Sequence, residues 1–344
     1  MGPLTSKKGL TMAKSGPLFG LVLPNQGVAF GAITVAELIE LAEAAEQTGV
    51  FESVFVGDSL LAKPRMESIT LLSALAVRTT KVRLGTACMA SFPLRNPIVL
   101  AAQWGALDNL AEGRTILAAC IGAGGPTGGA EGAFQREFQA FGIAPRERAA
   151  RMEEGIAVLR ALWTEESASF HGRFFNFDDI TVRPMPVQKP APPIWIANNP
   201  HVFGLREDVI RRSVERVGRL ADGWMTSRAW PGEFRQGWEA VREAARAHGR
   251  SDKMQENCLY HNVNLNDDTE VAYAETKQFL DKYYSIDFSR EAIDRWSAYG
   301  PPERCVENLK EYLDAGVQML LIRFSSFKPR EQLERFVETV VPLL

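Results

Sequence analysis

The sequence predicts an α/β protein whose strands close into a (βα)8 barrel, the TIM-barrel fold, and three observations lead to that fold class. Apolar segments typical of strands recur eight times along the 344 residues, and segments with the helical period lie between them. The length falls within the range of one large α/β barrel. Alternating strands and helices indicate a parallel sheet, and eight repeats favour a closed barrel over an open sheet of about five or six strands.

The predicted strands are short apolar segments, most of them followed by polar residues or glycine. In chain order they cover residues 17–23, 53–58, 82–89, 114–122, 193–198, 222–226, 258–265 and 317–324.

Three segments between these strands show the helical pattern most clearly. In 146–163 the apolar residues recur on one face, and they are Met152, Ile156, Leu159 and Trp163. The segments 208–220 and 302–315 have the same stripe. Gly316 follows the last of them at the position where a left-handed helix end is expected.

Two insertions interrupt the repeat. Residues 165–193, between helix 4 and strand 5, are aromatic and then rich in proline, which excludes a helix and predicts a short β-hairpin or lid. About 50 residues separate strands 7 and 8, which predicts a helical insertion before strand 8. We expect a disordered tail over residues 1–15 and a single domain over 16–344. The phenylalanines of the hairpin are expected to pack it onto the barrel.

Composition excludes several classes of function. A net charge of −3 with dispersed basic residues gives no footprint for nucleic acid, and no segment approaches the ~20 apolar residues of a membrane span. The four cysteines are far apart and form no CxxC pair. Their spacing argues against a zinc site and a disulfide framework, and it fits a cytoplasmic location.

Reactive groups of a (βα)8 barrel gather at the C-terminal ends of the strands. The residues that follow the predicted strands are mostly polar and uncharged, with Asp58 as the only carboxylate and His261 as the only imidazole. A metal hydrolase needs several converging histidines and carboxylates, and a glycosidase needs two facing carboxyls. The strand ends therefore favour a protein whose cofactor supplies the chemistry, with no metal.

The segment IGAGGPTGGAEG after the fourth strand resembles a nucleotide-binding loop at first sight. A dinucleotide fingerprint needs GxGxxG at the start of a helix, but here the third glycine position is Thr127 and Pro126 interrupts the loop. No helix is expected until well past Gly132. Two interpretations stay open: a long mobile loop over the mouth, or a backbone on which Gly122 and Gly124 leave room for a flat ring or sugar chain.

Several motifs resemble those of one family when taken in order. They are FVGDSLLAKPRMES (55–68), KVRLGTACMASFPLRNP (81–97), LDNLAEGR (107–114), FQAFGIAPRERAARMEEGIAVLRALW (138–163), SFHGRFFNF (169–177) and RVGRLADGWM (216–225). In this order and spacing the chain resembles the bacterial luciferase-like flavin-dependent monooxygenases, including relatives that use a 5-deazaflavin coenzyme. The resemblance implies a (βα)8 barrel with an insertion, a homodimer, and a flavin ring bound at the C-terminal mouth.

The resemblance also implies which residues bind the cofactor. It puts a strand-three bulge with a non-prolyl cis peptide at Ala87–Cys88, behind the flavin ring, and Thr226 and Ser227 near the phosphate tail. The full cofactor-binding set that it implies is Asp58, Ala87, Cys88, Ile121, Gly122, Gly124, Ala197, Asn198, Asn199, Thr226 and Ser227. A glutamate proton donor of the sugar-phosphate dehydrogenase branch falls on Ala123, so that chemistry is not expected.

Asp58 and His261 are the candidate catalytic residues, and each has a structural alternative. Asp58 also fits a cap of the following turn, and His261 also fits a hydrogen-bonded barrel histidine. Cys88 and Cys120 fit small core residues of strands. Arg228 and Arg323 fit either a phosphate site or ion pairs, and the sequence does not separate these.

Three hypotheses of function follow. The first is a monooxygenase that takes reduced FMN from a separate flavin reductase and uses O2 to oxygenate a small organic substrate. The second is hydride transfer dependent on the deazaflavin coenzyme F420, because GDSLLAKPR (57–65) resembles that branch. The third is a flavin-binding barrel without catalytic activity.

Overall fold

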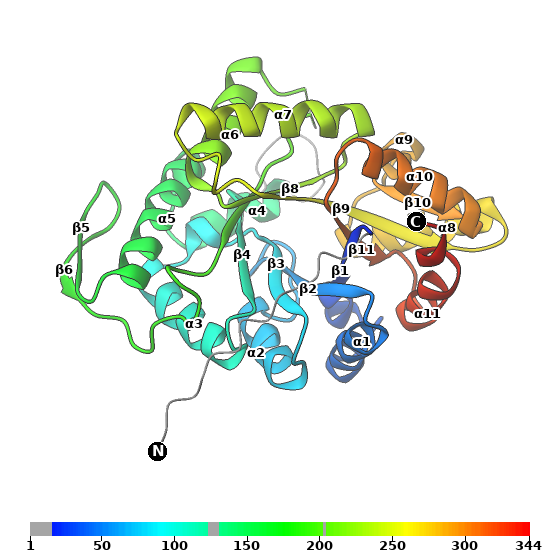
Figure 1. The fold of residues 1–344 in the computed structure, drawn as a ribbon, viewed down its shortest axis with the longest axis horizontal. Coiled ribbons are helices and arrows are strands. Elements are labelled where there is room, and N and C mark those ends of the chain that lie inside the picture. Colours follow the sequence, from blue (N-terminus) through cyan, green and yellow to red (C-terminus); the bar gives the residue numbers. More distant parts are fainter. Residues whose placement is uncertain (1–15, 123–130, 202–203) are drawn as a thin grey trace.

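Eight parallel strands close into a barrel in the computed structural model, which describes residues 16–122, 131–201 and 204–344 (Figure 1). Pairing of β1 with β11 and of β8 with β9 completes the closure. The barrel strands are β1 (Leu18–Leu23), β2 (Phe51–Asp58), β3 (Arg83–Met89), β4 (Thr115–Ala119), β7 (Ile194–Ala197), β8 (Gly223–Ser227), β9 (Glu256–Leu265) and β11 (Met319–Phe324). The predicted fold class and all eight predicted strands are confirmed.

Helices surround the barrel on its outer side (Figure 1). The α-helices are α1 (Val35–Thr48), α2 (Ser68–Arg78), α3 (Pro97–Leu110), α4 (Glu131–Ala140), α5 (Arg148–Thr164), α6 (Glu207–Leu220), α7 (Pro231–Ala247), α8 (Thr269–Tyr284), α9 (Arg290–Asp294), α10 (Pro302–Asp314) and α11 (Pro329–Thr339). Short 3-10 turns are η1 (Asn25–Phe30), η2 (Phe92–Leu94), η3 (Pro145–Glu147) and η4 (Val341–Leu343). The three helices predicted from periodicity are α5, α6 and α10, and Gly316 after α10 has the expected left-handed backbone. Within the described residues, no helix combines the length and apolar character that a bilayer span requires.

The helix after the glycine-rich loop begins earlier than predicted. We expected no helix until well past Gly132, but α4 begins at Glu131 and includes that glycine. Phe134 and Phe138 lie one helical turn apart and are both buried, so they form the apolar stripe of this helix. The glycine-rich segment before them had led to the prediction of a loop. Gly124 and the rest of 123–130 lie outside the described residues.

The first insertion forms the predicted hairpin, but it is not a lid. Strands β5 (Ala168–His171) and β6 (Asn176–Ile180) pair antiparallel beside α5, at the periphery of the molecule (Figure 1). The carboxylate of Glu154 in α5 accepts hydrogen bonds from backbone N–H groups of the hairpin turn, 173–175. Phe170, Phe175 and Phe177 pack against the main core, as expected.

The chain after this hairpin lies at the end of the barrel opposite the candidate site. Gln188 donates a 2.9 Å hydrogen bond to the carbonyl oxygen of Thr115, the first residue of β4. Parallel strands begin at one end of a barrel and carry their reactive groups at the other. This part of the insertion therefore lies away from the C-terminal mouth.

The second insertion contains a strand that was not predicted. It consists of α8, α9, a short strand β10 (Ser297–Gly300) and α10, and β10 pairs parallel with the C-terminal part of β9. The long strand β9 projects beyond its barrel neighbours and receives β10 there. This arrangement brings Tyr284 at the end of α8 close to Trp296, with ring centroids 5.3 Å apart.

The interior of the barrel is filled below the mouth. Phe55 and Trp195 point inward and stack with ring centroids 6.0 Å apart, and both are fully buried. A Cβ atom on Gly85 would lie 2.6 Å from the Phe55 ring, so the strand must be bare there for the ring to fit. This packing leaves no room for a ligand inside the barrel below the mouth.

Candidate active site

Half-buried residues gather at the C-terminal ends of four adjacent strands, β3, β4, β7 and β8, above the fully buried strand interiors. They are Ala87, Cys88, Cys120, Ile121, Gly122, Ala197, Asn198, Asn199 and Ser227. We call this set the uncharged wall. It contains eight of the eleven predicted cofactor-binding positions. Asp58 and Thr226 are buried, and Gly124 lies outside the described residues.

The bulge in β3 has the predicted cis peptide between Ala87 and Cys88. The register of β3 against β2 and β4 shifts at this point, so the two residues leave the regular ladder and face the mouth. A hydrogen bond with Cys120, burial, and the nearby charge of Asp58 raise the pKa of the Cys88 thiol well above its ordinary value. The Cys88 thiol is therefore uncharged at neutral pH.

Gly122 has a left-handed backbone, with φ of +74°. A Cβ atom there would lie 2.9 Å from the carbonyl oxygen of Ala90. A residue with a Cβ atom fits this position only if the backbone shifts. The chain just after β4 therefore has no side chain at Gly122.

Two adjacent asparagines follow β7, and they differ in their hydrogen bonds. Asn199 is used within the protein, since its Oδ1 accepts from the Thr226 hydroxyl and the Ser227 N–H, at 3.0 and 2.9 Å. Asn198 has a buried Nδ2 with no hydrogen-bond partner among the described residues. Buried amide donors are nearly always paired, so Asn198 offers a donor to a ligand.

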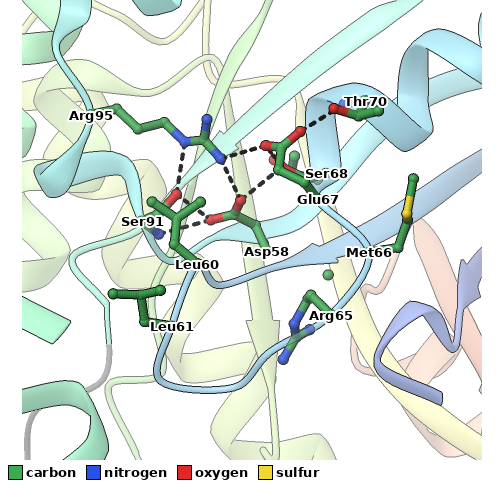
Figure 2. Close-up of polar contacts among 12 residues, drawn as sticks. Asp58, Leu60, Leu61, Arg65, Met66, Glu67, Ser68, Thr70, Ser91 and Arg95 are labelled. Carbon is green, nitrogen blue, oxygen red and sulfur yellow. Dashed lines mark hydrogen bonds and ion pairs between the residues drawn. The ribbon is translucent and has the colours of Figure 1, made fainter. Parts of the chain in front are cut away.

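Asp58 lies at the centre of a saturated buried network (Figure 2). Its Oδ1 accepts from the Ser68 hydroxyl at 2.7 Å and from Arg95 Nη2 at 2.9 Å. Its Oδ2 accepts from the N–H and the hydroxyl of Ser91, at 2.8 and 2.6 Å. Arg95 also pairs with Glu67 at 2.8 Å. We call these five residues the Asp58 network.

Four donors occupy the lone-pair sites of the Asp58 carboxylate, so it has none free for a ligand. The network instead ties the loop after β2 to the loop after β3. Asp58 thus does more than cap its own turn, the alternative considered from sequence, because its partners come from two loops.

His261 does not face the mouth. It is fully buried on the outer side of β9, where Nε2 lies 3.2 Å from Oδ1 of Asn308 in α10 and the ring packs 5.0 Å from that of Tyr312. Burial lowers the pKa of His261 to about 4, so the ring is neutral at physiological pH. The structure does not bring His261 together with Asp58. Its surroundings match the hydrogen-bonded barrel histidine considered from sequence.

Across the mouth from the uncharged wall lies a group of basic side chains. Arg323 on β11 is fully buried, and its Nε donates to Asn262 Oδ1 at 2.9 Å and its Nη1 to the Tyr284 hydroxyl at 2.7 Å. Its Nη2 is buried without a hydrogen-bond partner. No carboxylate is an ion-pair partner of Arg323 among the side chains that the structure describes, so the ion-pair alternative does not hold there.

The rings of Tyr284 and Trp296 each lie against two of the cations. Lys63 Nζ lies 4.5 Å from the centre of the Tyr284 ring, and the Arg323 guanidinium lies 5.1 Å from it. The guanidinium groups of Arg228 and Arg323 lie 4.4 and 5.3 Å from the Trp296 ring. Favourable contacts of cations with ring faces offset part of their mutual repulsion.

Arg65 completes this group from the loop after β2. Its Nη2 donates to Gln26 Oε1 at 2.8 Å, and Figure 2 shows its side chain turned away from Asp58. A Cβ atom on Gly57 would collide with the Arg65 guanidinium, so the glycine lets this side chain cross the end of β2. We call Lys63, Arg65, Arg228 and Arg323 the cation cluster.

The electrostatics of the cluster appear in two pKa shifts, those of Lys63 and Tyr284. Burial, then the charges of Arg228, Arg65 and Arg323, lower the pKa of Lys63 to about 7. Burial raises the pKa of the Tyr284 hydroxyl, but the positive charges of Arg323 and Arg65 outweigh it and the net pKa is lowered. Both shifts have the sign of a site with excess positive charge.

Sequence analysis missed Lys63, Arg65, Tyr284 and Trp296 as site residues. Lys63 and Arg65 belong to the motif FVGDSLLAKPRMES (55–68). The prediction took only the residues directly after each strand, and these two lie farther along the loop. Tyr284 and Trp296 come from the insertion before the last strand, and only its folding brings them to the mouth. Among the described side chains, no group of three or more histidine, cysteine or acidic residues is arranged to hold a metal.

Comparison with known proteins agrees with this architecture. The sequence model of the luciferase-like monooxygenase family matches residues 18–319. The chain is 27% identical to the F420-dependent glucose-6-phosphate dehydrogenase of Amycolatopsis mediterranei (strain U-32), over 334 residues that cover 90% of this chain and 94% of the relative. The enzyme of the same name from Gordonia bronchialis is 25% identical over 335 residues, covering 90% and 93%.

Solved structures share the fold. The monooxygenase RslO1 from Streptomyces bottropensis superposes with a TM-score of 0.76 at 24% identity, covering 94% of this chain and 99% of that one. An F420-dependent secondary alcohol dehydrogenase, solved with an F420–acetone adduct, superposes with a TM-score of 0.77 at 19% identity, covering 95% and 98%. At these identities the likeness concerns the fold.

Proposed function

The chain belongs to the luciferase-like monooxygenase family, and from this premise we propose that it is an oxidoreductase that uses coenzyme F420 to transfer a hydride to or from a small organic substrate. The relatives reported above carry F420-dependent dehydrogenase activity in their names. They favour the deazaflavin hypothesis over the first hypothesis from sequence. That first hypothesis was a monooxygenase that uses reduced FMN from a separate reductase together with O2. That the chain is an oxidoreductase of this family is common to both hypotheses.

The uncharged wall is the observation that carries the proposal. A flat tricyclic ring needs a bare surface and a few donors for its polar edge. The wall offers the bulge at Ala87–Cys88, the side-chain-free backbone at Gly122 and the unpaired Nδ2 of Asn198. These residues fit the cofactor that the family implies.

In the proposed complex, Ala87 and Cys88 support the back of the ring, Gly122 leaves room beside it and Asn198 donates a hydrogen bond. When bound, the coenzyme supplies the site that accepts or delivers a hydride. The chain contributes position, exclusion of water and a fixed polar surround. Asp58 acts as a positioning residue in this proposal, because its network fixes the two loops that frame the bulge.

The proposal does not extend to glucose 6-phosphate as substrate. The resemblance puts the glutamate proton donor of that branch at Ala123 in this sequence, and alanine transfers no proton. A different group must therefore handle the proton in this chain.

Titration of the protein separately with F420 and with reduced FMN, without oxygen, tests the proposal. We expect micromolar binding of F420 and weaker binding of reduced FMN. Asn198→Ala removes the free donor, and we expect it to weaken F420 binding about tenfold while the fold is retained. Asn308→Ala, outside the mouth, is the control.

The outcomes separate the three hypotheses. Tight binding of reduced FMN alone, with oxygen-dependent consumption of an organic substrate, would restore the monooxygenase reading. Tight F420 binding with no turnover of any alcohol or carbonyl compound would favour a barrel without catalytic activity.

A further inference from the structure

Lys63, Arg65 and Arg323 form no ion pair with a carboxylate among the side chains that the structure describes. The charges that act on Lys63 come from Arg228, Arg65 and Arg323, and all three are positive. Several like charges in a half-buried site repel one another, and proteins keep such an arrangement where a ligand of opposite charge completes it.

Arg323 supplies an independent observation. Two of its three nitrogens are hydrogen-bonded, to Asn262 and Tyr284, and the third, Nη2, is buried and unpaired. An unpaired charged donor removed from water is costly, and such donors are paired in most structures. A ligand oxygen at Nη2 would satisfy it.

Exposure differs between Arg323 and the groups around it. Lys63, Arg65, Arg228 and Tyr284 are half-buried, whereas Arg323 is fully buried. The rings of Tyr284 and Trp296 lie against the cations. We therefore call the three half-buried cations the rim of the cluster and Arg323 its base.

We propose that the cation cluster binds an oxyanion of the substrate, a carboxylate or a phosphate, with Arg323 Nη2 as the donor at the base and Lys63, Arg65 and Arg228 at the rim. The inference rests on the proposed function for its assignment to the substrate. The uncharged wall is formed by the ends of β3, β4, β7 and β8. The cluster is formed by the loop after β2, by β11 and by the residue after β8, so it faces the wall and leaves the wall to the cofactor.

The oxyanion must change the protonation of Lys63. The groups that face Lys63 are Arg65 on its own loop, Arg228 after β8, Arg323 on β11, and Tyr284 on α8. From α4 come Phe134, with its ring 5.6 Å from Nζ, and Glu137, whose carboxylate accepts the N–H groups of 60–62.

A negative ligand in this cluster raises the pKa of Lys63, so binding at about pH 8 takes up a proton from buffer. Binding below about pH 6 takes up almost none, because Lys63 is then already charged. A structural role of the lysine alone produces no such proton uptake.

Isothermal titration of the protein without coenzyme tests the inference, with sodium phosphate and sodium benzoate as separate probes and benzyl alcohol as the neutral control. Titrations at about pH 8 in two buffers of different ionisation enthalpy measure the proton uptake. We expect one of the two oxyanions to bind and the neutral compound not to bind. The tighter oxyanion identifies the source as a phosphate or a carboxylate.

Variants assign the site. Arg323→Met and Lys63→Met are each expected to weaken oxyanion binding about tenfold or more, because a charge-assisted hydrogen bond is lost. Arg290→Met is the matched control, since Arg290 lies 4.2 Å from the Tyr273 ring but outside the cluster. Should Arg323→Met fail to fold, Lys63→Met on the loop decides.

Two results would overturn the inference: no binding of either oxyanion, or equal binding by all three variants. Weaker F420 binding in Arg323→Met, with unchanged oxyanion binding, would reassign the cluster to the coenzyme tail and would equally overturn it. Loss of oxyanion binding in the variants with normal F420 binding supports it. Normal oxyanion binding without any F420 binding would instead reject the proposed function and leave the oxyanion site standing.

Discussion

Two buried charged groups lie at the same end of the barrel, and they differ in how completely the protein satisfies them. In the Asp58 network, four donors reach the two oxygens of one carboxylate, and Arg95 bridges it to Glu67. In the cation cluster, Arg323 keeps a buried nitrogen without a partner, and the charges that lower the pKa of Lys63 are all positive.

The difference separates a structural role from a ligand-binding one. A buried charge with every hydrogen bond made inside the protein contributes to the position of the chain, and its removal leaves partners unpaired. A buried charge with unmade hydrogen bonds is stabilised only when something else enters. The first group therefore predicts effects on stability, and the second predicts effects on binding.

The largest effect is expected from Arg95→Met in the saturated network. The variant leaves the Asp58 carboxylate, 1% exposed, without an ion-pair partner, and we expect the free energy of unfolding to fall by about 3 kcal/mol. Denaturant unfolding measures this change. F420 binding is expected to weaken as well, because the bulge at Ala87–Cys88 loses its fixed neighbouring loops.

Arg78→Met is the control for this comparison. Arg78 pairs with Glu43 at 2.7 Å, but its side chain is 54% exposed, so we expect a loss of only about 0.5 kcal/mol. Equal losses in the two variants would show that burial and saturation of the Asp58 network do not matter.

Gly122→Ala extends the comparison between stability and binding to the uncharged wall. A left-handed alanine whose Cβ lies 2.9 Å from a backbone oxygen is expected to lower the free energy of unfolding by about 2 kcal/mol. We also expect F420 affinity to fall about tenfold, since the methyl group and the shifted backbone reduce the room beside the ring.

Gly142→Ala separates strain from ligand contact. Gly142 has φ of +65° with open space around its Cβ position, so the variant suffers only the backbone strain, about 1 kcal/mol. Its F420 affinity is expected to equal that of the unchanged protein. An equal loss of affinity in both glycine variants would remove Gly122 from the proposed site.

The same contrast explains how much of the molecule was predictable from sequence. Strand and helix periodicity depend on neighbours along the chain, so all eight barrel strands and the helices α5, α6 and α10 were predicted. The cis bond at Ala87–Cys88 followed from the family resemblance. The start of α4 was missed because a glycine-rich pattern outweighed the spacing of Phe134 and Phe138.

The cation cluster was not predictable, because it depends on contacts between residues far apart in sequence. Tyr284 and Arg323 are separated by 39 positions, and only the pairing of β10 with β9 brings the insertion to the mouth. The role of His261 was open for a related reason. Alternation along β9 decides which side its ring faces, and sequence alone did not fix the inward residues.

The last prediction concerns the pH dependence of the contribution of Lys63 to stability. Its pKa is about 7 in the folded protein and 10.5 when unperturbed, so between these values the unfolded chain holds a proton that the folded chain has released. The free energy of unfolding then rises with pH across this window, relative to Lys63→Met, and is lowest below about pH 7 where the folded lysine is charged. Denaturant unfolding of both proteins from about pH 6 to about pH 10 measures the difference.

Lys277→Met is the control for this measurement. A repeat with phosphate or benzoate present tests whether an oxyanion in the cluster changes the result. Hydrogen bonds to Asp281 and Asp287 raise the pKa of Lys277, so it stays protonated in both states over the same window and its difference curve is flat. The oxyanion that binds the cluster raises the pKa of Lys63 and must flatten its curve also. A Lys63 curve that is flat without any anion would mean that neither burial nor the cations around it lower its pKa. The contrast with the saturated Asp58 network would then be one of geometry alone.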